Sequence, residues 1–142
     1  REKILKILGL KFLKKKEMQE ETKEILDDLA IKVKSVSSKV EFLSGGQRQS
    51  IAIGKAVASN PKVLIMDEPT SALAVAEVES VLNLINKVKS LKVSVILITH
   101  RLQDIFKVCD RIMVLYEGRN VAERRINETD LSEIVSLIVA EH

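Results

Sequence analysis

The sequence has few of the residues that mark secreted, fibrous or membrane-spanning proteins. Its 142 residues include one cysteine, Cys109, which cannot form an internal disulfide, so a disulfide-stapled secreted module is excluded and a reducing cytosol is favoured. Five glycines and two prolines exclude a collagen-like chain. No apolar run approaches the ~18 residues that span a bilayer, and no signal peptide is recognisable. Because the first residue is Arg1 and not Met, we expect the sequence to be part of a longer protein.

An excess of one charge is also missing. The sequence has 23 Lys and Arg residues against 20 Asp and Glu residues, which gives a formal net charge of +3. The basic run Lys14–Lys16 is followed within a few residues by Glu17, Glu20 and Glu21. Such mixing is typical of a solvated helix face, so the charge pattern gives little support for nucleic acid as a partner. The hydrophobic share of 46% allows a sizeable core in one domain and excludes a disordered tail.

The first 60 residues predict mainly helices. Residues 1–34 are rich in Lys and Glu, and they predict a short helix over about residues 2–8 before a longer one. The apolar face of the longer helix consists of Met18, Ile25, Leu26 and Leu29. Residues 35–42, which contain three serines and show no periodicity, predict a loop. Ser44 is then a candidate N-cap for a helix over about Gly45–Ser59, which Asn60 and Pro61 would end.

From Pro61 onward the pattern changes to alternating strands and helices. Apolar runs predict strands at Val63–Met66, Val93–Ile98 and Arg111–Tyr116. The first two are expected to be buried, as strands of a parallel sheet are. Amphipathic segments around residues 75–88 and 102–108 predict helices between the strands. A turn at residues 117–120, a short strand and a helix over about residues 130–140 complete an α/β pattern.

The segment Leu43–Gln49 is a candidate phosphate site. After the capping Ser44, two glycines let the backbone approach a ligand closely. The helix that follows offers unpaired N–H groups and the positive end of its dipole. A Ser-Gly-Gly helix start is equally the pattern of a plain helix cap, so both interpretations stay open for this segment alone.

Two acids and a histidine follow the apolar strands. Asp67 and Glu68 come directly after the first strand, and Thr99 and His100 follow the second. Ligands of open α/β sheets gather at the carboxyl ends of the strands, where one carboxylate can hold Mg²⁺ and its neighbour can deprotonate water. If the two strands lie side by side, His100 emerges at the same edge as the acids. Taken separately, each of these residues is as compatible with a structural role.

In their order and spacing these segments resemble the nucleotide-binding subunit of ABC transporters. The string Leu43–Gln49 is followed, after about 14 residues, by a strand ending in Asp67-Glu68-Pro69-Thr70-Ser71, and then by a strand ending in Thr99-His100. The resemblance covers essentially the whole sequence. It implies an α/β fold of the P-loop NTPase-like (RecA-like) class. Residues 61–142 would form the C-terminal part of the parallel-sheet lobe without its N-terminal strands, and residues 1–60 would form part of the helical subdomain with the signature helix.

The resemblance also implies roles for single residues. The signature motif, which contacts the γ-phosphate of ATP held by the opposite subunit, corresponds to Ser44, Gly45, Gly46 and Gln47. Asp67 matches the Walker B aspartate that supports Mg²⁺. Glu68 matches the general base for the hydrolytic water, and His100 matches the switch histidine that reaches the γ-phosphate and that water.

The sequence departs from the family pattern at two points. It has no Gly-x-x-x-x-Gly-Lys-[Ser/Thr] phosphate loop, because its single Gly-Lys pair, Gly54-Lys55, is followed by Ala56. In the family that loop lies upstream, so we expect this chain to be the C-terminal part of a subunit and to lack ATPase activity alone. The second departure is Ala74, which stands where the loop after Walker B usually has Asp, and this puts tight coupling between two sites in doubt.

The resemblance predicts an ATP-binding and ATP-hydrolysing subunit of an ABC transporter, with ATP and Mg²⁺ as its cofactors. The loop Ala72–Val75 is similar to that of sugar importers, so a sugar is the expected solute. The expected partners are a second ATPase subunit packed head to tail and transmembrane permease subunits, at the cytoplasmic face of the membrane, without nucleic acid. The alternative is a non-transport ABC ATPase that acts on DNA or ribosomes.

Overall fold

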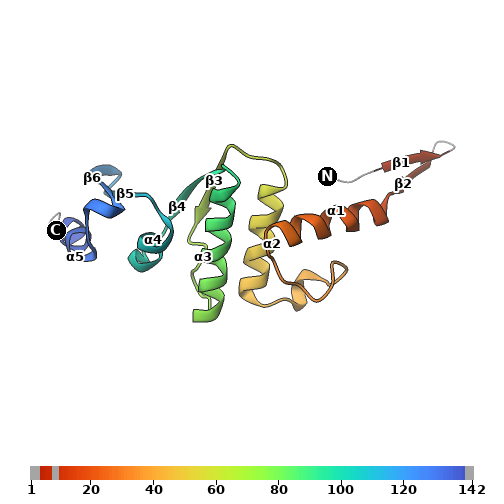
Figure 1. The fold of residues 1–142 in the computed structure, drawn as a ribbon, viewed down its shortest axis with the longest axis horizontal. Helices are drawn as coiled ribbons and strands as arrows, with labels where there is room; N and C mark the ends of the chain where they lie inside the picture. Colours follow the sequence, from red (N-terminus) through yellow and green to blue (C-terminus); the bar gives the residue numbers. More distant parts are fainter. Residues whose placement is uncertain (1–3, 8–9, 140–142) are drawn as a thin grey trace. The chain divides into compact units, whose positions relative to one another are not determined.

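The computed structural model describes residues 4–7 and 10–139 (Figure 1). They form two compact units. The first contains the described residues up to Leu64 together with Thr70–Ser94, and the second contains Ile65–Pro69 and the described residues from Val95 onward. No helix in the described part of the chain is long and apolar enough to cross a membrane.

The first unit opens with a hairpin rather than with the expected short helix. Strand β1 (Ile4–Ile7) pairs antiparallel with β2 (Leu10–Leu13), with Ile4 opposite Leu13. The predicted helix over about residues 2–8 is therefore wrong for residues 4–7. Each strand is four residues long and Gly9 lies between them in the sequence, so neither segment is long enough to nucleate a stable helix, whereas pairing of the two satisfies their backbone groups.

Helix α1 (Lys15–Asp28) occupies only part of residues 1–34, which were predicted to be helical. The helix stops at Ala30, which has a left-handed φ of 54° and is followed by a hydrogen bond from the Ile31 N–H to the Leu26 carbonyl. Leu26 and Leu29, two of the four predicted face residues, are buried together with Ile31. The chain then reaches the short 3₁₀ helix η1 (Val40–Phe42) and α2 (Gly45–Val57), which ends two residues before the predicted Ser59.

Helix α3 (Val75–Ser90) supplies half of the buried hydrophobic side chains in the described part of the first unit. It packs against α2, and its buried side chains are Val78, Val81, Leu82, Leu84, Ile85 and Val88. These side chains form one broad face, and the opposite face of the helix is exposed. The amphipathic pattern of the sequence thus predicted this helix and most of its apolar face, but Val75, at its first position, is 83% exposed.

Strands β3 (Val63–Asp67) and β4 (Ser94–Ile98) pair in a two-stranded sheet. The Ser94 N–H donates to the Lys62 carbonyl, and the Glu68 N–H donates to the Ile98 carbonyl, so pairing advances in the same direction along both strands. Burial on both faces was expected, and this expectation is wrong. Alternate residues, including Ile65 and Ile96, are exposed, because the described residues cover only one face of this sheet.

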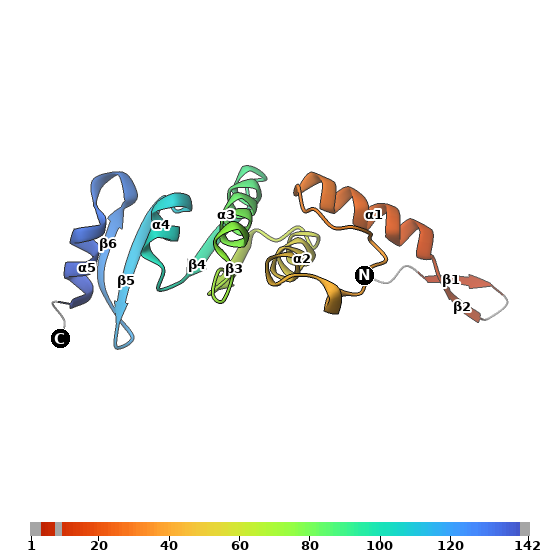
Figure 2. The same ribbon diagram turned by 90° about the horizontal axis from the view of Figure 1, so that it is seen from below.

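The second unit continues with α4 (Leu102–Val108), β5 (Arg111–Tyr116), β6 (Arg119–Arg125), the 3₁₀ helix η2 (Ile126–Glu128) and α5 (Leu131–Val139). The third predicted strand, β5, pairs antiparallel with β6 and not with the β3–β4 sheet, because a two-residue turn joins them. Figure 2 shows α5 lying along this hairpin. The core formed by α4, α5 and this hairpin consists of Ile105, Ile112, Val114, Ala122 and Ile134.

Candidate functional site

The turn Ser44–Gln47, called the signature turn below, forms a capping box at the start of α2. The Ser44 Oγ accepts a hydrogen bond from the Gln47 N–H at 3.3 Å, and the Gln47 Oε1 accepts one from the Ser44 N–H at 3.1 Å. This reciprocal pair satisfies two backbone donors that a helix start otherwise leaves free. The cap at Ser44 was predicted from the sequence. Gln47, which was assigned to nucleotide, has a further structural contact, since its Nε2 donates to the Lys32 carbonyl at 3.3 Å.

The two glycines allow another segment of the chain to lie against this turn. A Cβ added to Gly46 would lie 2.7 Å from the Glu77 Cβ and 3.0 Å from its Cγ, a separation that real side chains do not adopt. A Cβ on Gly45 would lie 3.1 Å from a methyl group of Leu73. The two glycines therefore allow close packing of α3 and the loop before it, and the close approach of a ligand stays a prediction.

Glu77 is the residue of this site that the sequence analysis missed. Its Oε1 accepts from the Gly46 N–H and its Oε2 from the Ala74 N–H, each at 3.2 Å. The Ser44 hydroxyl also donates to it, and these three donors hold the pKa of the Glu77 carboxyl below its usual range, with Ser44 the largest contributor. A signal was present, because a Glu at the third position of a helix is half of a capping box, although Ala74 offers no side-chain acceptor in return.

A groove of about 770 Å³ opens beside this turn, between the end of α1 and the faces of α2 and α3. Ser44, Gly46, Gln47 and Glu77 line one part of it. Its charged lining is of both signs and consists of Asp27, Asp28, Lys32, Glu77 and Lys87. The signature turn is therefore open to the outside on the groove side.

The second group of predicted site residues lies at the ends of β3 and β4. The Glu68 Oε1 lies 2.7 Å from the His100 Nδ1 and accepts the His100 backbone N–H at 3.0 Å. The Thr99 hydroxyl donates to the Glu68 Oε2 at 3.3 Å. The structure thus brings Glu68 and His100 together at one sheet edge, as the sequence predicted for neighbouring strands.

The contacts of Glu68 favour its ionised form. The hydrogen bond from the His100 side chain lowers the pKa of Glu68 most, and the His100 backbone N–H and Thr99 act in the same direction against partial desolvation. Glu68 also has a left-handed φ of 45°, which is unusual for a residue other than glycine. Residues held in sparsely populated backbone regions are concentrated at functional sites, so this conformation strengthens the candidate.

Asp67, the predicted metal ligand, is exposed at the last position of β3. No group of three or more His, Cys, Asp or Glu side chains in the described ranges could hold a metal by itself. One exposed carboxylate still fits Mg²⁺, which binds through one or two carboxylates and takes its other ligands from substrate phosphates and water. Asp67, Glu68 and His100 belong to the second unit, whereas Ser44–Gln47 belong to the first.

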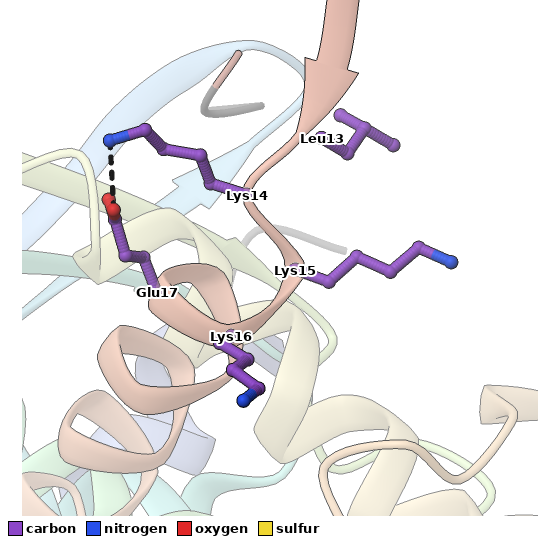
Figure 3. Close-up of a pocket in the computed structure, with 5 residues that line it drawn as sticks. All are labelled: Leu13, Lys14, Lys15, Lys16 and Glu17. Carbon is purple, nitrogen blue, oxygen red and sulfur yellow. Dashed lines mark hydrogen bonds and ion pairs between the residues drawn. The ribbon is translucent and has the colours of Figure 1, made fainter. Parts of the chain in front are cut away.

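The basic run Lys14–Lys16, at the start of α1, forms no comparable site. Leu13–Glu17 line a shallow surface depression, in which the Lys14 Nζ contacts the Glu17 Oε1 at 2.8 Å (Figure 3). Lys15 and Lys16 extend away from this pair (Figure 3). Both partners of the pair are partly exposed, so it contributes little to stability. The run is the solvated helix face that its mixed charges predicted.

Comparison with known proteins agrees with this geometry. Residues 2–71 match the family model described as ABC transporter. The xylose/arabinose import ATP-binding protein XylG of Sulfolobus acidocaldarius is 42% identical over 129 residues, which are 91% of this chain and 51% of that protein. The ribose import ATP-binding protein RbsA of Bacillus licheniformis is 41% identical over 130 residues, which are 92% of this chain and 26% of that protein.

Solved structures give the same result for the fold. One match is the ADP conformation of MJ1267, an ATP-binding cassette of an ABC transporter, with a TM-score of 0.71 and 30% sequence identity. The match covers 86% of this chain and 46% of the MJ1267 chain. The dimeric cassette MJ0796 matches 78% of this chain and 48% of its own with a TM-score of 0.64 at 28% identity. The chain spans about half the length of these cassettes and of XylG. The chain therefore carries an ABC transporter family domain over residues 2–71 and has the α/β fold of ATP-binding cassettes, of the P-loop NTPase-like class.

Proposed function

We propose that this chain is part of the ATP-hydrolysing subunit of an ABC importer whose solute is a sugar. The observation that carries the proposal is the Glu68–His100 pair at the ends of two neighbouring strands, held at 2.7 Å. Sugar specificity is supported by XylG and RbsA, whose names describe import of xylose, arabinose and ribose. In this proposal residues 1–60 belong to the helical subdomain and residues 61–142 to the α/β lobe.

Glu68 takes the role of general base. Because its hydrogen bonds to His100 and Thr99 favour the ionised form, the carboxylate can accept a proton from water at neutral pH. The same contacts fix its orientation, while the side chain of His100 stays exposed and can reach a phosphate brought to this edge. Mg²⁺ bound at Asp67 would neutralise charge that develops on the phosphates.

Ser44–Gln47 face the nucleotide of the opposite subunit in a head-to-tail dimer. Two observations support a partner on this side of the first unit. Phe42, two residues before Ser44, is 78% exposed, and Val75, two residues after the Gly45-contacting Leu73, is 83% exposed. Large apolar side chains beside a polar turn are typical of surfaces that a partner covers. MJ0796, which has the same fold, has been solved as a dimer.

The complete ATPase needs a phosphate loop, and this sequence has none. We therefore expect the 142-residue chain to lack ATPase activity alone. We expect it to hydrolyse ATP only when a polypeptide segment that carries a phosphate loop completes each nucleotide site. The assembled subunit would bind permease subunits at the cytoplasmic face of the membrane. Movement of the permease would follow closure of the two subunits around ATP.

The test is Glu68→Gln in the assembled, transport-competent ATPase. The substitution keeps the shape of the side chain and removes the proton acceptor, so ATP hydrolysis should fall by about 10²- to 10⁴-fold while Mg-ATP binding persists. Glu128→Gln, an exposed carboxylate in the same unit, is the matched control and should leave turnover unchanged. Turnover that survives Glu68→Gln would refute the assignment of the base.

A further inference from the structure

The donors expected to hold a terminal phosphate already hold an anion of this chain. The Ser44 hydroxyl and the Gly46 N–H both donate to the Glu77 carboxylate, with the Gly46 nitrogen 3.2 Å from the Glu77 Oε1. The third donor, the Ala74 N–H, lies at the start of α3. Two helix N-termini therefore point at one carboxylate, which is the arrangement that also binds phosphate groups.

The carboxylate and a phosphate cannot use these donors together. Each N–H or O–H group has one hydrogen to give, and both ligands are anions, so they repel each other at contact distance. Displacement is geometrically possible, because Glu77 also lines the open groove beside the turn and the lysines Lys32 and Lys87 line the same groove. The acids Asp27 and Asp28 also line this groove. A displaced Glu77 carboxylate would therefore enter a groove that carries both positive and negative side chains.

We propose that Glu77 is a positioning residue that occupies the phosphate donors of the signature turn until the terminal phosphate of the nucleotide replaces it. The inference rests on the proposed function, because it takes Ser44 and Gly46 as phosphate ligands. While bound, Glu77 holds the turn against the start of α3 through the Gly46 N–H and the Ser44 hydroxyl, and it caps the Ala74 N–H of its own helix. Once phosphate binds, both of these links are released. Glu77 therefore couples occupancy of the turn to the position of the loop before α3, where Ala74 replaces the usual Asp.

The experiment uses the ¹⁵N-labelled 142-residue chain and inorganic phosphate as the probe. The amide signals of Gly45 and Gly46 report binding at the turn, and Glu77→Gln keeps the shape of the side chain but removes its charge. We expect phosphate to bind this variant roughly five- to tenfold more tightly than the wild type, because the competing anion is gone. Glu77→Asp keeps the charge and should show no such gain. Glu24→Gln, which removes an exposed carboxylate of α1, is the control for net charge.

Each other result counts against the proposal. Equal phosphate affinity in the wild type and Glu77→Gln, with circular dichroism showing that both are folded, would mean that Glu77 is only a structural contact. An equal gain in phosphate affinity in Glu24→Gln would show that the effect comes from the net charge of the chain and not from the position of Glu77. If phosphate shifts neither glycine amide signal in any variant, the proposal that Glu77 occupies a phosphate site is refuted. The independent Glu68→Gln measurement on the assembled ATPase then decides whether the proposed function fails with it.

Discussion

Glu68 combines a left-handed backbone with a carboxylate that accepts hydrogen bonds from His100 and Thr99. Its N–H donates to the Ile98 carbonyl at 2.8 Å, which extends the hydrogen bonding between β3 and β4 by one residue beyond the end of β3. The strand pairing therefore places the carboxylate next to His100, and the two side chains need no further element to meet. The local fold and the proposed chemistry depend on the same contacts.

Removing the imidazole should raise the pKa of Glu68 toward the ordinary value of 4.5, because the His100 side chain is the largest cause of its depression. A carboxyl whose pKa is lower in the folded protein stabilises it fully above the unfolded-state value, and this contribution is lost as the pH falls through the folded-state pKa. His100→Ala should therefore lose stability at neutral pH and show less additional loss on acidification below pH 4.5. Carboxyl ¹³C NMR and acid unfolding measure both effects, with His142→Ala as the control. An unchanged Glu68 pKa in His100→Ala would contradict this.

Sequence reasoning found the site residues whose signals are local. Ser44 is a capping residue before a helix, and Glu68 and His100 directly follow apolar strands. Glu77 was missed because its local signal indicates only a cap within α3, whereas its contact with Gly46, 31 residues away, depends on the packing of α2 on α3. The same packing explains why Gly46 is a glycine, which the sequence ascribed to ligand approach alone.

At the scale of elements, α2 and α3 are held at a spacing that leaves no room for a side chain at Gly46. Gly46→Ala places a methyl group 2.7 Å from the Glu77 Cβ, so one of the two helix starts must shift. Overpacking of this kind costs about 1–3 kcal/mol and outweighs the ~0.5–1 kcal/mol that alanine gains over glycine in a helix. We expect Gly46→Ala to lower the melting temperature of the chain, measured by circular dichroism.

Gly54→Ala is the matched control in the same helix. Its added Cβ would meet the δ-methyl group of Ile31 at 3.0 Å, which is the end of a side chain and can move more easily than a Cβ. The loss of stability should therefore be smaller than for Gly46→Ala. The reverse order would show that the spacing of α2 and α3 is set elsewhere.

Most element boundaries were predictable because the signals are short-range. The predicted end of α2 at Ser59 lies two residues beyond its actual end at Val57, and the apolar runs gave β3 and β5 almost to the residue. The errors concern pairing and burial, which depend on distant residues. The residues Ile4–Ile7 form a strand because Leu10–Leu13 pairs with them, and nothing in the run Val63–Met66 tells whether both faces of a strand are covered.

At the scale of the whole molecule, one face of the β3–β4 sheet is apolar and open. In the second unit Ile65 is 63% exposed, and Ile96 and Ile98 are each 50% exposed. These residues alternate with inward-facing ones, so their side chains share one face. An apolar sheet face of this kind is driven out of water by association, and unpaired strand edges beside it favour pairing between copies.

The isolated chain should therefore self-associate in a concentration-dependent way. The double variant Ile65→Thr with Ile96→Thr keeps the β-propensity of both strands and removes apolar surface, so it should be more monomeric than the wild type in sedimentation velocity. Leu91→Thr with Val139→Thr removes exposed apolar side chains outside this sheet and should leave association unchanged. A wild type that remains monomeric as its concentration rises would contradict the prediction. Equal association in the two double variants would show that the β3–β4 face is not the surface that drives it.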